Sequence, residues 1–165
     1  MPKATLSVDE IMAILRTTIP RLTESTKGLT RTQLHTAPAE GEWSINDVLA
    51  HLRACGDVLG GAMQRILDED GPGWTAMSPR TWQRKSGYHD WEFEPAFAAF
   101  ADQRRLLLAR LDVVSPADWQ RTATVKVPPT VYERTVRYYG DWLAGHERIH
   151  VTHMGRLAEA FRGPA

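Results

Sequence analysis

Four segments of the sequence repeat apolar residues at a spacing of three to four positions, which is the period of an amphipathic α-helix. The segments span residues 7–27, 44–69, 94–113 and 135–161. Alternating apolar residues, the pattern of a β-strand, occur only in short runs, of which Thr122–Val127 is the best. The sequence therefore predicts an all-α chain that forms a four-helix bundle of the up-and-down type, in which each helix buries one apolar face.

Capping residues mark the ends of these segments. Ser7 and Ser44 are candidate N-caps, and Asp47 follows Ser44 by three residues, as in a capping box. Gly71–Gly73 is predicted to end the second helix. Pro20 lies inside the first helix, where a proline ring predicts a kink.

The connection between the second and third helices is long. Residues 71–91 carry four aromatic side chains, which are Trp74, Trp82, Tyr88 and Trp91. Loops of this length are often functional, so this one either forms a wall of a substrate site or packs on the bundle as an anchor, and we favour packing. We expect a long aromatic-rich crossover loop between helices two and three.

Length and charge exclude several classes of protein. The 165 residues include 20 Lys and Arg against 20 Asp and Glu, so we expect no basic surface for nucleic acid or an anionic membrane. No apolar run approaches the roughly 20 residues that span a bilayer, and residues 1–10 lack the apolar core of a signal peptide. The single cysteine, Cys55, excludes an internal disulfide and a CxxC site. These features predict one soluble, cytoplasmic domain over residues 1–165 that acts on a small-molecule substrate.

Three of the six histidines lie together in the last helix, at positions 146, 150 and 153. His146 and His150 are one turn apart, and both project near the centre of the apolar stripe of that helix. An imidazole in the bundle interior costs free energy unless its nitrogens find partners, and a shared metal ion satisfies two such rings together. His51, on the flank of the apolar stripe of the second helix, is the candidate third ligand.

Other interpretations of these histidines stay open at this point. A single buried histidine such as His51 is more often a hydrogen-bonded core residue than a metal ligand. His153 follows His150 by three residues, which is also a spacing between ligands. However, His146 and His153 are roughly 10.5 Å apart along the helix axis, so one ion is not expected to bind both together with His150.

The segment His146–His150 also matches the H-E-x-x-H pattern of zinc peptidases, in which Glu147 would act as general base. The extended form of that motif requires glycine at position 153 and histidine at position 156. This chain has His153 and Arg156 there. The sequence therefore gives a peptidase little support.

Two groups of residues together resemble a known family. Trp43-Ser44, Val48-Leu49 and His51-Leu52 open the second helix, and His146 and His150 lie one turn apart in the last. In this order, and over nearly the whole chain, they resemble the DinB/YfiT-like superfamily of bacterial four-helix-bundle metalloenzymes. The resemblance implies one divalent ion, usually zinc or nickel, that is held by three histidines and completed by water. Carried over residue by residue, it implies His51, His146 and His150 as the metal ligands. It favours these three over His153, where many relatives have glutamine, and it leaves His153 as an outer hydrogen-bond partner, a pocket acid or base, or an alternative ligand.

The resemblance also implies a range of activities. Members with assigned activities include transferases and isomerases that use mycothiol or bacillithiol, and metal-dependent hydrolases, and dimers are frequent among them. We therefore expect a DinB-like metal-dependent enzyme, either a transferase with a low-molecular-weight thiol cosubstrate or a hydrolase. The alternative is a non-catalytic, metal-stabilised bundle or a stress-related homodimer. That alternative predicts a filled coordination sphere, or histidines with ordinary hydrogen-bond partners and no adjoining pocket.

Helical spacing places three further residues near the predicted site. Asp47 precedes His51 by one turn, so it could accept the free N–H of that ring or simply cap the helix. Glu147 is a candidate catalytic residue that could reach a metal-bound water, and its alternative is a salt bridge between helices. Cys55 follows His51 by one turn, and we expect it to be a small buried thiol.

Overall fold

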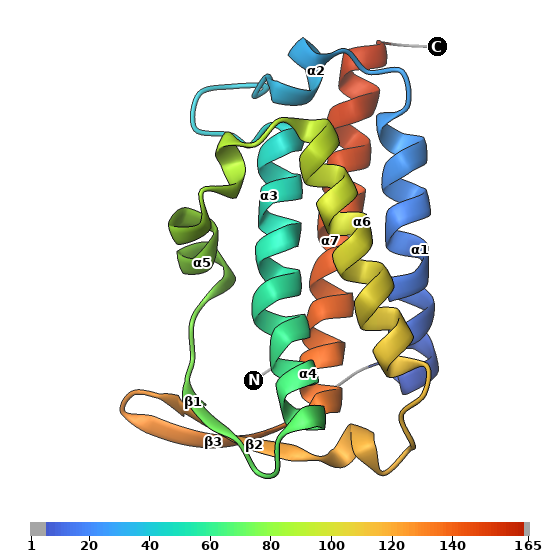
Figure 1. Ribbon diagram of the computed structural model, residues 1–165. Helices are drawn as coiled ribbons and strands as arrows, with labels where there is room; N and C mark the ends of the chain where they lie inside the picture. The colour runs from blue at the N-terminus through green and yellow to red at the C-terminus, as the bar shows by residue number, and fades with distance from the viewer. Residues whose placement is uncertain (1–5, 164–165) are drawn as a thin grey trace.

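The computed structural model describes residues 6–163, and its four long helical segments lie side by side (Figure 1). They are α1 (Val8–Thr26), α3 (Ile45–Cys55) with its continuation α4 (Gly61–Asp68), α6 (Phe93–Leu111) and α7 (Val136–Arg162). The predicted four-helix bundle is confirmed. Residues 1–5 and 164–165, the ends of the predicted domain, lie outside the described residues. No helix within residues 6–163 is long and apolar enough to cross a membrane.

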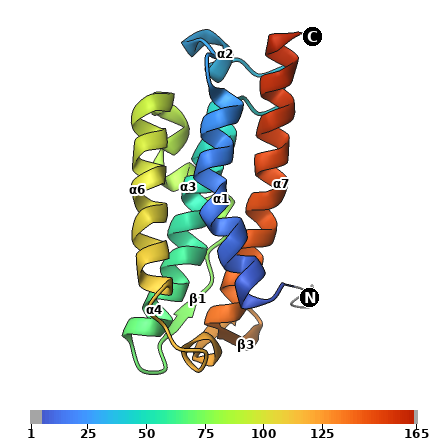
Figure 2. The same ribbon diagram turned by 90° about the vertical axis from the view of Figure 1, so that its right-hand side faces the viewer.

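The helices run in two directions. α1 and α7 run one way, and α3–α4 and α6 run the other way (Figure 1). Figure 2 shows α1 in front of α3, with α6 and α7 on either side, so α1 and α3 occupy opposite corners of the bundle. Two helices run up and two run down, but not in alternation, because the predicted crossover returns the chain along the bundle before α6 begins.

The predicted helix starts at Ser7 and Ser44, which cap α1 and α3, are confirmed by reciprocal hydrogen bonds. Ser7 Oγ accepts from the backbone N–H of Glu10 at 3.2 Å, while the Ser7 N–H donates to the Glu10 carboxylate at 2.7 Å. Ser44 Oγ accepts from the Asp47 N–H at 3.1 Å, and the Ser44 N–H donates to the Asp47 carboxylate at 2.9 Å. α1 continues through Pro20, which lies inside the helix.

The second helical segment contains a π-helical turn, η1 (Gly56–Gly60), where the sequence predicts a uniform α-helix. A Cβ atom on Gly56 would lie 2.0 Å from Gln103 Oε1, and one on Gly60 would lie 3.3 Å from Leu107 Cδ2. The glycines therefore let α6 pack closely against this turn. Single π-helical turns are rare and often occur at functional sites.

The crossover contains secondary structure that the sequence analysis missed. It forms β1 (Gly73–Thr75), α5 (Pro79–Ser86) and a short 3₁₀ turn, η2 (Tyr88–Asp90), so the predicted crossover is only partly a loop. Ser78 caps α5 and Pro79 is its first residue, which is a common way for a helix to begin. α5 lies beside α3 (Figure 1).

A small sheet closes one end of the bundle (Figure 1). The predicted strand is confirmed as β2 (Thr122–Val127), which pairs in parallel with β1 and antiparallel with β3 (Thr130–Thr135). β3 was not predicted, because its side chains are exposed or half-buried and leave no clear apolar alternation. The sheet is minor, and the fold remains that of a helical bundle.

Aromatic and charged contacts hold the crossover to the bundle. The Asp57 carboxylate, on η1, accepts hydrogen bonds from Trp82 Nε1 at 2.7 Å and from the Tyr88 hydroxyl at 2.6 Å. The Arg53 guanidinium lies over the rings of Tyr88 and Trp91, 3.8 Å and 4.4 Å from their centroids. These aromatic residues therefore anchor the crossover by packing, which is the interpretation that we favoured from the sequence.

The bundle core consists of two apolar clusters with polar residues between them. One cluster includes Ile11, Leu15, Leu59, Met63, Leu107 and Leu143. The other includes Leu22, Ile45, Leu49, Phe100, Val151 and Met154. Thr18, Arg104 and Glu147 each stand between members of the two clusters along α1, α6 and α7, and each is buried. Buried polar groups need partners, so this layer is the part of the core that requires a specific explanation.

Candidate metal centre

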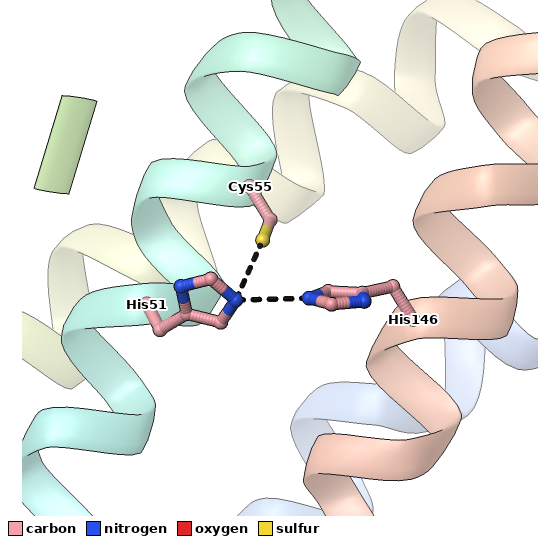
Figure 3. Close-up of side chains that lie close together, drawn as sticks. All are labelled: His51, Cys55 and His146. Carbon is pink, nitrogen blue, oxygen red and sulfur yellow. Dashed lines mark hydrogen bonds between the residues drawn. The ribbon is translucent and has the colours of Figure 1, made fainter. Parts of the chain in front are cut away.

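Three imidazole rings from two helices meet between α3 and α7. His51 comes from α3, whereas His146 and His150 come from successive turns of α7. His51 Nε2 lies 2.8 Å from His146 Nε2, which in turn lies 3.1 Å from His150 Nε2. Figure 3 shows the His51 and His146 rings facing each other across the gap between their helices. The structure thus brings together the three histidines that were predicted as ligands.

Gln83, from α5, sets the tautomer of His51. The Gln83 side-chain Nε2 donates to the Asp47 carbonyl oxygen at 3.5 Å, and Gln83 Oε1 lies 3.0 Å from His51 Nδ1. Because Oε1 can only accept a hydrogen bond, His51 Nδ1 carries the proton and His51 Nε2 carries a lone pair. A hydrogen-bonded N–H on one side and a free lone pair on the other is the usual state of a metal-binding histidine.

Burial lowers the pKa of all three imidazoles. Desolvation is the main cause for His51 and for His146. It is also the main cause for His150, where the neighbouring His146 and His51 rings add to it and lower the pKa to about 3. The rings are therefore neutral near pH 7, which is the form that binds a metal ion.

These low pKa values predict that the metal-free protein loses stability in acid. The pKa of His150 falls from 6.5, its ordinary value, to about 3 on folding. Below pH 6.5 the unfolded chain therefore takes up a proton that the folded chain does not bind. The free energy of unfolding should decrease as the pH falls from 6.5 towards about 3. Thermal melting of EDTA-treated protein across this range measures the effect. His150→Gln should show a shallower dependence on pH, and identical slopes for the two proteins would contradict the prediction.

A fourth donor atom, Cys55 Sγ, lies near the histidines. It is 3.5 Å from His51 Nε2 (Figure 3), and donor atoms of His51, Cys55 and His146 all lie within 4.8 Å of one another. Cys55 is fully buried, as expected, and this burial raises the pKa of its thiol, with the charge of Glu147 adding to the effect. Because a thiol binds metal only after losing its proton, the neutral imidazoles are the better donors.

Glu147 faces α1 and α6. Its carboxylate forms a two-point ion pair with Arg104, in which Nη1 lies 2.8 Å from Oε2 and Nη2 contacts Oε1. The Thr18 hydroxyl donates to Oε2 at 2.8 Å. Glu147 has no exposed surface, and Arg104 is 2% exposed. These contacts are those of a salt bridge between helices, which is the alternative to the predicted catalytic role of Glu147.

Two other candidates lie outside the histidine cluster. The Asp47 carboxylate caps α3 through Ser44, and only the backbone carbonyl of Asp47 takes part in orienting Gln83. The centroid of the His153 ring is 6.4 Å from that of His150, and His153 lines a hollow on the outer surface of α7. Neither residue belongs to the group of three histidines whose Nε2 atoms face one another.

A cavity of about 160 Å³ adjoins the three imidazoles. Its other lining residues are Ser78, Pro79, Arg80 and Trp142. The Trp43 ring, just before α3, packs against the rings of His51 and His150, with centroids 5.0 Å and 6.0 Å apart. Sequence analysis missed Arg80 and Gln83 as site residues. The Ser78-Pro79 helix start was the one signal of the helix that carries them.

Comparisons with known proteins found a matching family, a curated relative and a similar solved fold. Residues 14–154 match the DinB superfamily. The chain is 30% identical over 150 residues to YuaE of Bacillus subtilis (strain 168), an uncharacterized protein, and the match covers 81% of this chain and 88% of YuaE. Its fold is similar to that of YfiT from Bacillus subtilis, with a TM-score of 0.79 and 17% identity over 99% of this chain and 94% of YfiT. YfiT is described as a probable metal-dependent hydrolase with an unusual four-helix bundle topology.

Proposed function

The chain belongs to the DinB superfamily, and we propose that it is a metal-dependent hydrolase of a small molecule, with a divalent ion held by His51, His146 and His150. The observation that carries this proposal is the hydrogen bond between His51 Nδ1 and Gln83. It fixes the proton on Nδ1 and so leaves the lone pair of His51 Nε2 facing His146 Nε2. A proton on His146 Nε2 could bond to either neighbouring ring but not to both. One cation, by contrast, can accept the lone pairs of all three rings.

The donor set suits zinc or nickel, which are the ions that we propose. Such an ion, when bound by neutral imidazoles, keeps its charge and lowers the pKa of a bound water towards ~7. The protein residues have separate tasks around it. Gln83 holds the His51 ring in the required tautomer, Trp43 packs on two of the rings, and the adjoining cavity leaves room for a substrate.

The same cavity supports an enzyme over the non-catalytic alternative, because a purely structural metal site is closed by protein ligands. A zinc peptidase is disfavoured, since Glu147 pairs with Arg104 and is not free to act as general base. We prefer hydrolysis to thiol transfer because YfiT, whose fold is similar, is described as a probable metal-dependent hydrolase.

Cobalt binding tests the proposed ligands against a set that includes Cys55. We expect metal-free protein to take up one equivalent of Co²⁺ without an intense thiolate charge-transfer band. Cys55→Ala should bind Co²⁺ as the wild type does. His150→Ala should bind at least about 100-fold more weakly, because losing a ligand costs more than losing an outer hydrogen-bond partner. A thiolate band that disappears in Cys55→Ala would instead make Cys55 a ligand and contradict the proposed set.

Removing Gln83 tests how the His51 ring is held. Gln83→Ala leaves the His51 Nδ1–H without its acceptor, and losses of this kind weaken metal binding by about 10–100-fold. Competition against a chromophoric chelator measures the affinity. Lys85→Ala, an exposed change on the same helix, is the matched control and should bind zinc as the wild type does. If Gln83→Ala also binds zinc with wild-type affinity, Gln83 does not prepare His51 for the metal.

A further inference from the structure

The cavity beside the histidines contains one formal cation, Arg80, and no carboxylate among its lining residues. The Arg80 side chain forms no ion pair with any carboxylate in the described part of the chain. Its guanidinium lies over the Trp43 ring, with Cζ 5.2 Å from the ring centroid. An arginine that faces a cavity and donates no hydrogen bond to the described part of the protein has its N–H donors available to a ligand.

The backbone of Arg80 is held firmly, although its side chain is exposed. Ser78 Oγ accepts from the Thr81 N–H at 3.1 Å and so caps α5 immediately before Arg80, and Pro79 is buried. Gln83, one turn later, is tied to His51 at 3.0 Å. The helix that carries Arg80 is therefore capped at its start and joined to the histidine cluster through Gln83.

The histidine cavity adjoins a larger, mainly apolar hollow. Ser78 and Trp142 line both the cavity and a second hollow of about 490 Å³. The walls of the second hollow include Met77, Val125, Val127, Tyr138 and Tyr139. Trp142 is 41% exposed and stacks on Tyr139, with their ring planes 17° apart. An exposed aromatic wall next to a charged cavity suits a ligand that has an apolar body and one charged end.

We propose that the substrate is a small carboxylate with an apolar or aromatic body, whose carboxylate pairs with Arg80 while its body lies against Trp142. Arginine matches the planar geometry of a carboxylate and can donate two parallel hydrogen bonds to it. Arg80 and Trp142 line the same cavity as the three histidines, so a ligand that contacts both lies next to the histidine side chains. This inference rests on the proposed function and assigns substrate specificity to Arg80.

Calorimetric titration with 3-phenylpropanoate and its neutral amide, 3-phenylpropanamide, tests the inference. We expect the carboxylate to bind the wild type at least about tenfold more tightly than the amide does, because the amide has no negative charge to pair with the guanidinium. Arg80→Gln should weaken binding of the carboxylate by about tenfold and leave binding of the amide unchanged. Trp142→Ala should weaken binding of both compounds, because both carry the phenyl ring.

Arg84→Gln is the matched control, because it removes the same charge from the same helix at a residue that does not line the cavity. It should bind both compounds as the wild type does. Equal affinity of the carboxylate for the wild type and Arg80→Gln would overturn the inference, as would equal weakening by Arg84→Gln or no detectable binding of the carboxylate.

Each titration is carried out on zinc-loaded and on metal-free protein. The metal-free titration excludes direct binding of the carboxylate to an ion, and the effect of Arg80→Gln should persist there. A protein that takes up no zinc would contradict the proposed function, and the metal-free comparison would still decide the role of Arg80. Equal melting temperatures of the variants and the wild type show that the substitutions leave the fold intact.

Discussion

His146→Ala should abolish stoichiometric metal binding. The Nε2 atom of His146 lies 2.8 Å from that of His51 and 3.1 Å from that of His150, so this residue joins the other two predicted ligands. Apparent binding free energies of about 10–16 kcal/mol for four-ligand zinc sites correspond to about 2.5–4 kcal/mol for each ligand. We therefore expect zinc affinity to fall by at least about 100-fold, and metal-dependent hydrolysis to be lost with it. Chelator competition on the purified variant measures the affinity.

His153→Ala is the matched control for this experiment. His153 lies on the same helix but outside the cluster of facing Nε2 atoms, so its removal should leave zinc affinity unchanged. The metal-free melting temperature of His146→Ala should stay close to that of metal-free wild type, because the ring is only half-buried. A large drop in that melting temperature with wild-type zinc affinity would contradict the proposal and favour an ordinary core histidine.

Glu147→Ala should cause the largest loss of stability. It leaves the Arg104 guanidinium, which is 2% exposed, without its carboxylate, and it removes the acceptor of the Thr18 hydroxyl. Removing one partner of a buried ion pair lowers the free energy of unfolding by about 3–5 kcal/mol, because the remaining buried charge is left uncompensated. Urea unfolding monitored by circular dichroism measures this loss. The double variant Glu147→Leu/Arg104→Met should recover most of it, because no buried charge remains.

The ion pair and the histidine cluster are linked through α7. Glu147 directly follows His146, so the contact between Glu147 and Arg104 also fixes the rotation of α7 that turns His146 towards α3.

Glu147→Gln separates this structural role from catalysis. We expect this variant to lose stability while the folded protein keeps its metal-dependent activity. A variant with wild-type stability that loses activity would restore Glu147 as a catalytic base.

Local sequence patterns were enough to predict the four long helical segments and the pairing of two of the three proposed ligands, His146 and His150. The period of the apolar residues and the serine caps depend on near neighbours, and the structure confirms them. His146 and His150 could be placed together because helix geometry alone puts residues four apart on one face. The meeting of His51 with this pair depends on how α3 packs against α7, so the helical pattern offered His51 only as a candidate third ligand, and the family resemblance then favoured it.

The remaining parts of the site depend on tertiary contacts that no local pattern encodes. Gln83 and Arg80 lie near the histidines because the crossover packs against the bundle. Part of this packing comes from the hydrogen bonds that Asp57, on the π-helical turn, accepts from the crossover. Helical spacing placed Glu147 near the predicted site, but it could not show which residue of another helix lies against the Glu147 side chain. Its partner, Arg104, is a charged residue on the buried face of α6, where an apolar side chain is the usual expectation.

Elemental analysis of protein purified without a histidine tag tests the central claim most directly. We predict one equivalent of zinc or nickel per chain in the wild type, and none in a variant that lacks His51, His146 and His150 together. Less than about a tenth of an equivalent of any divalent transition metal, with no uptake when zinc or nickel is titrated into the protein, would contradict the account.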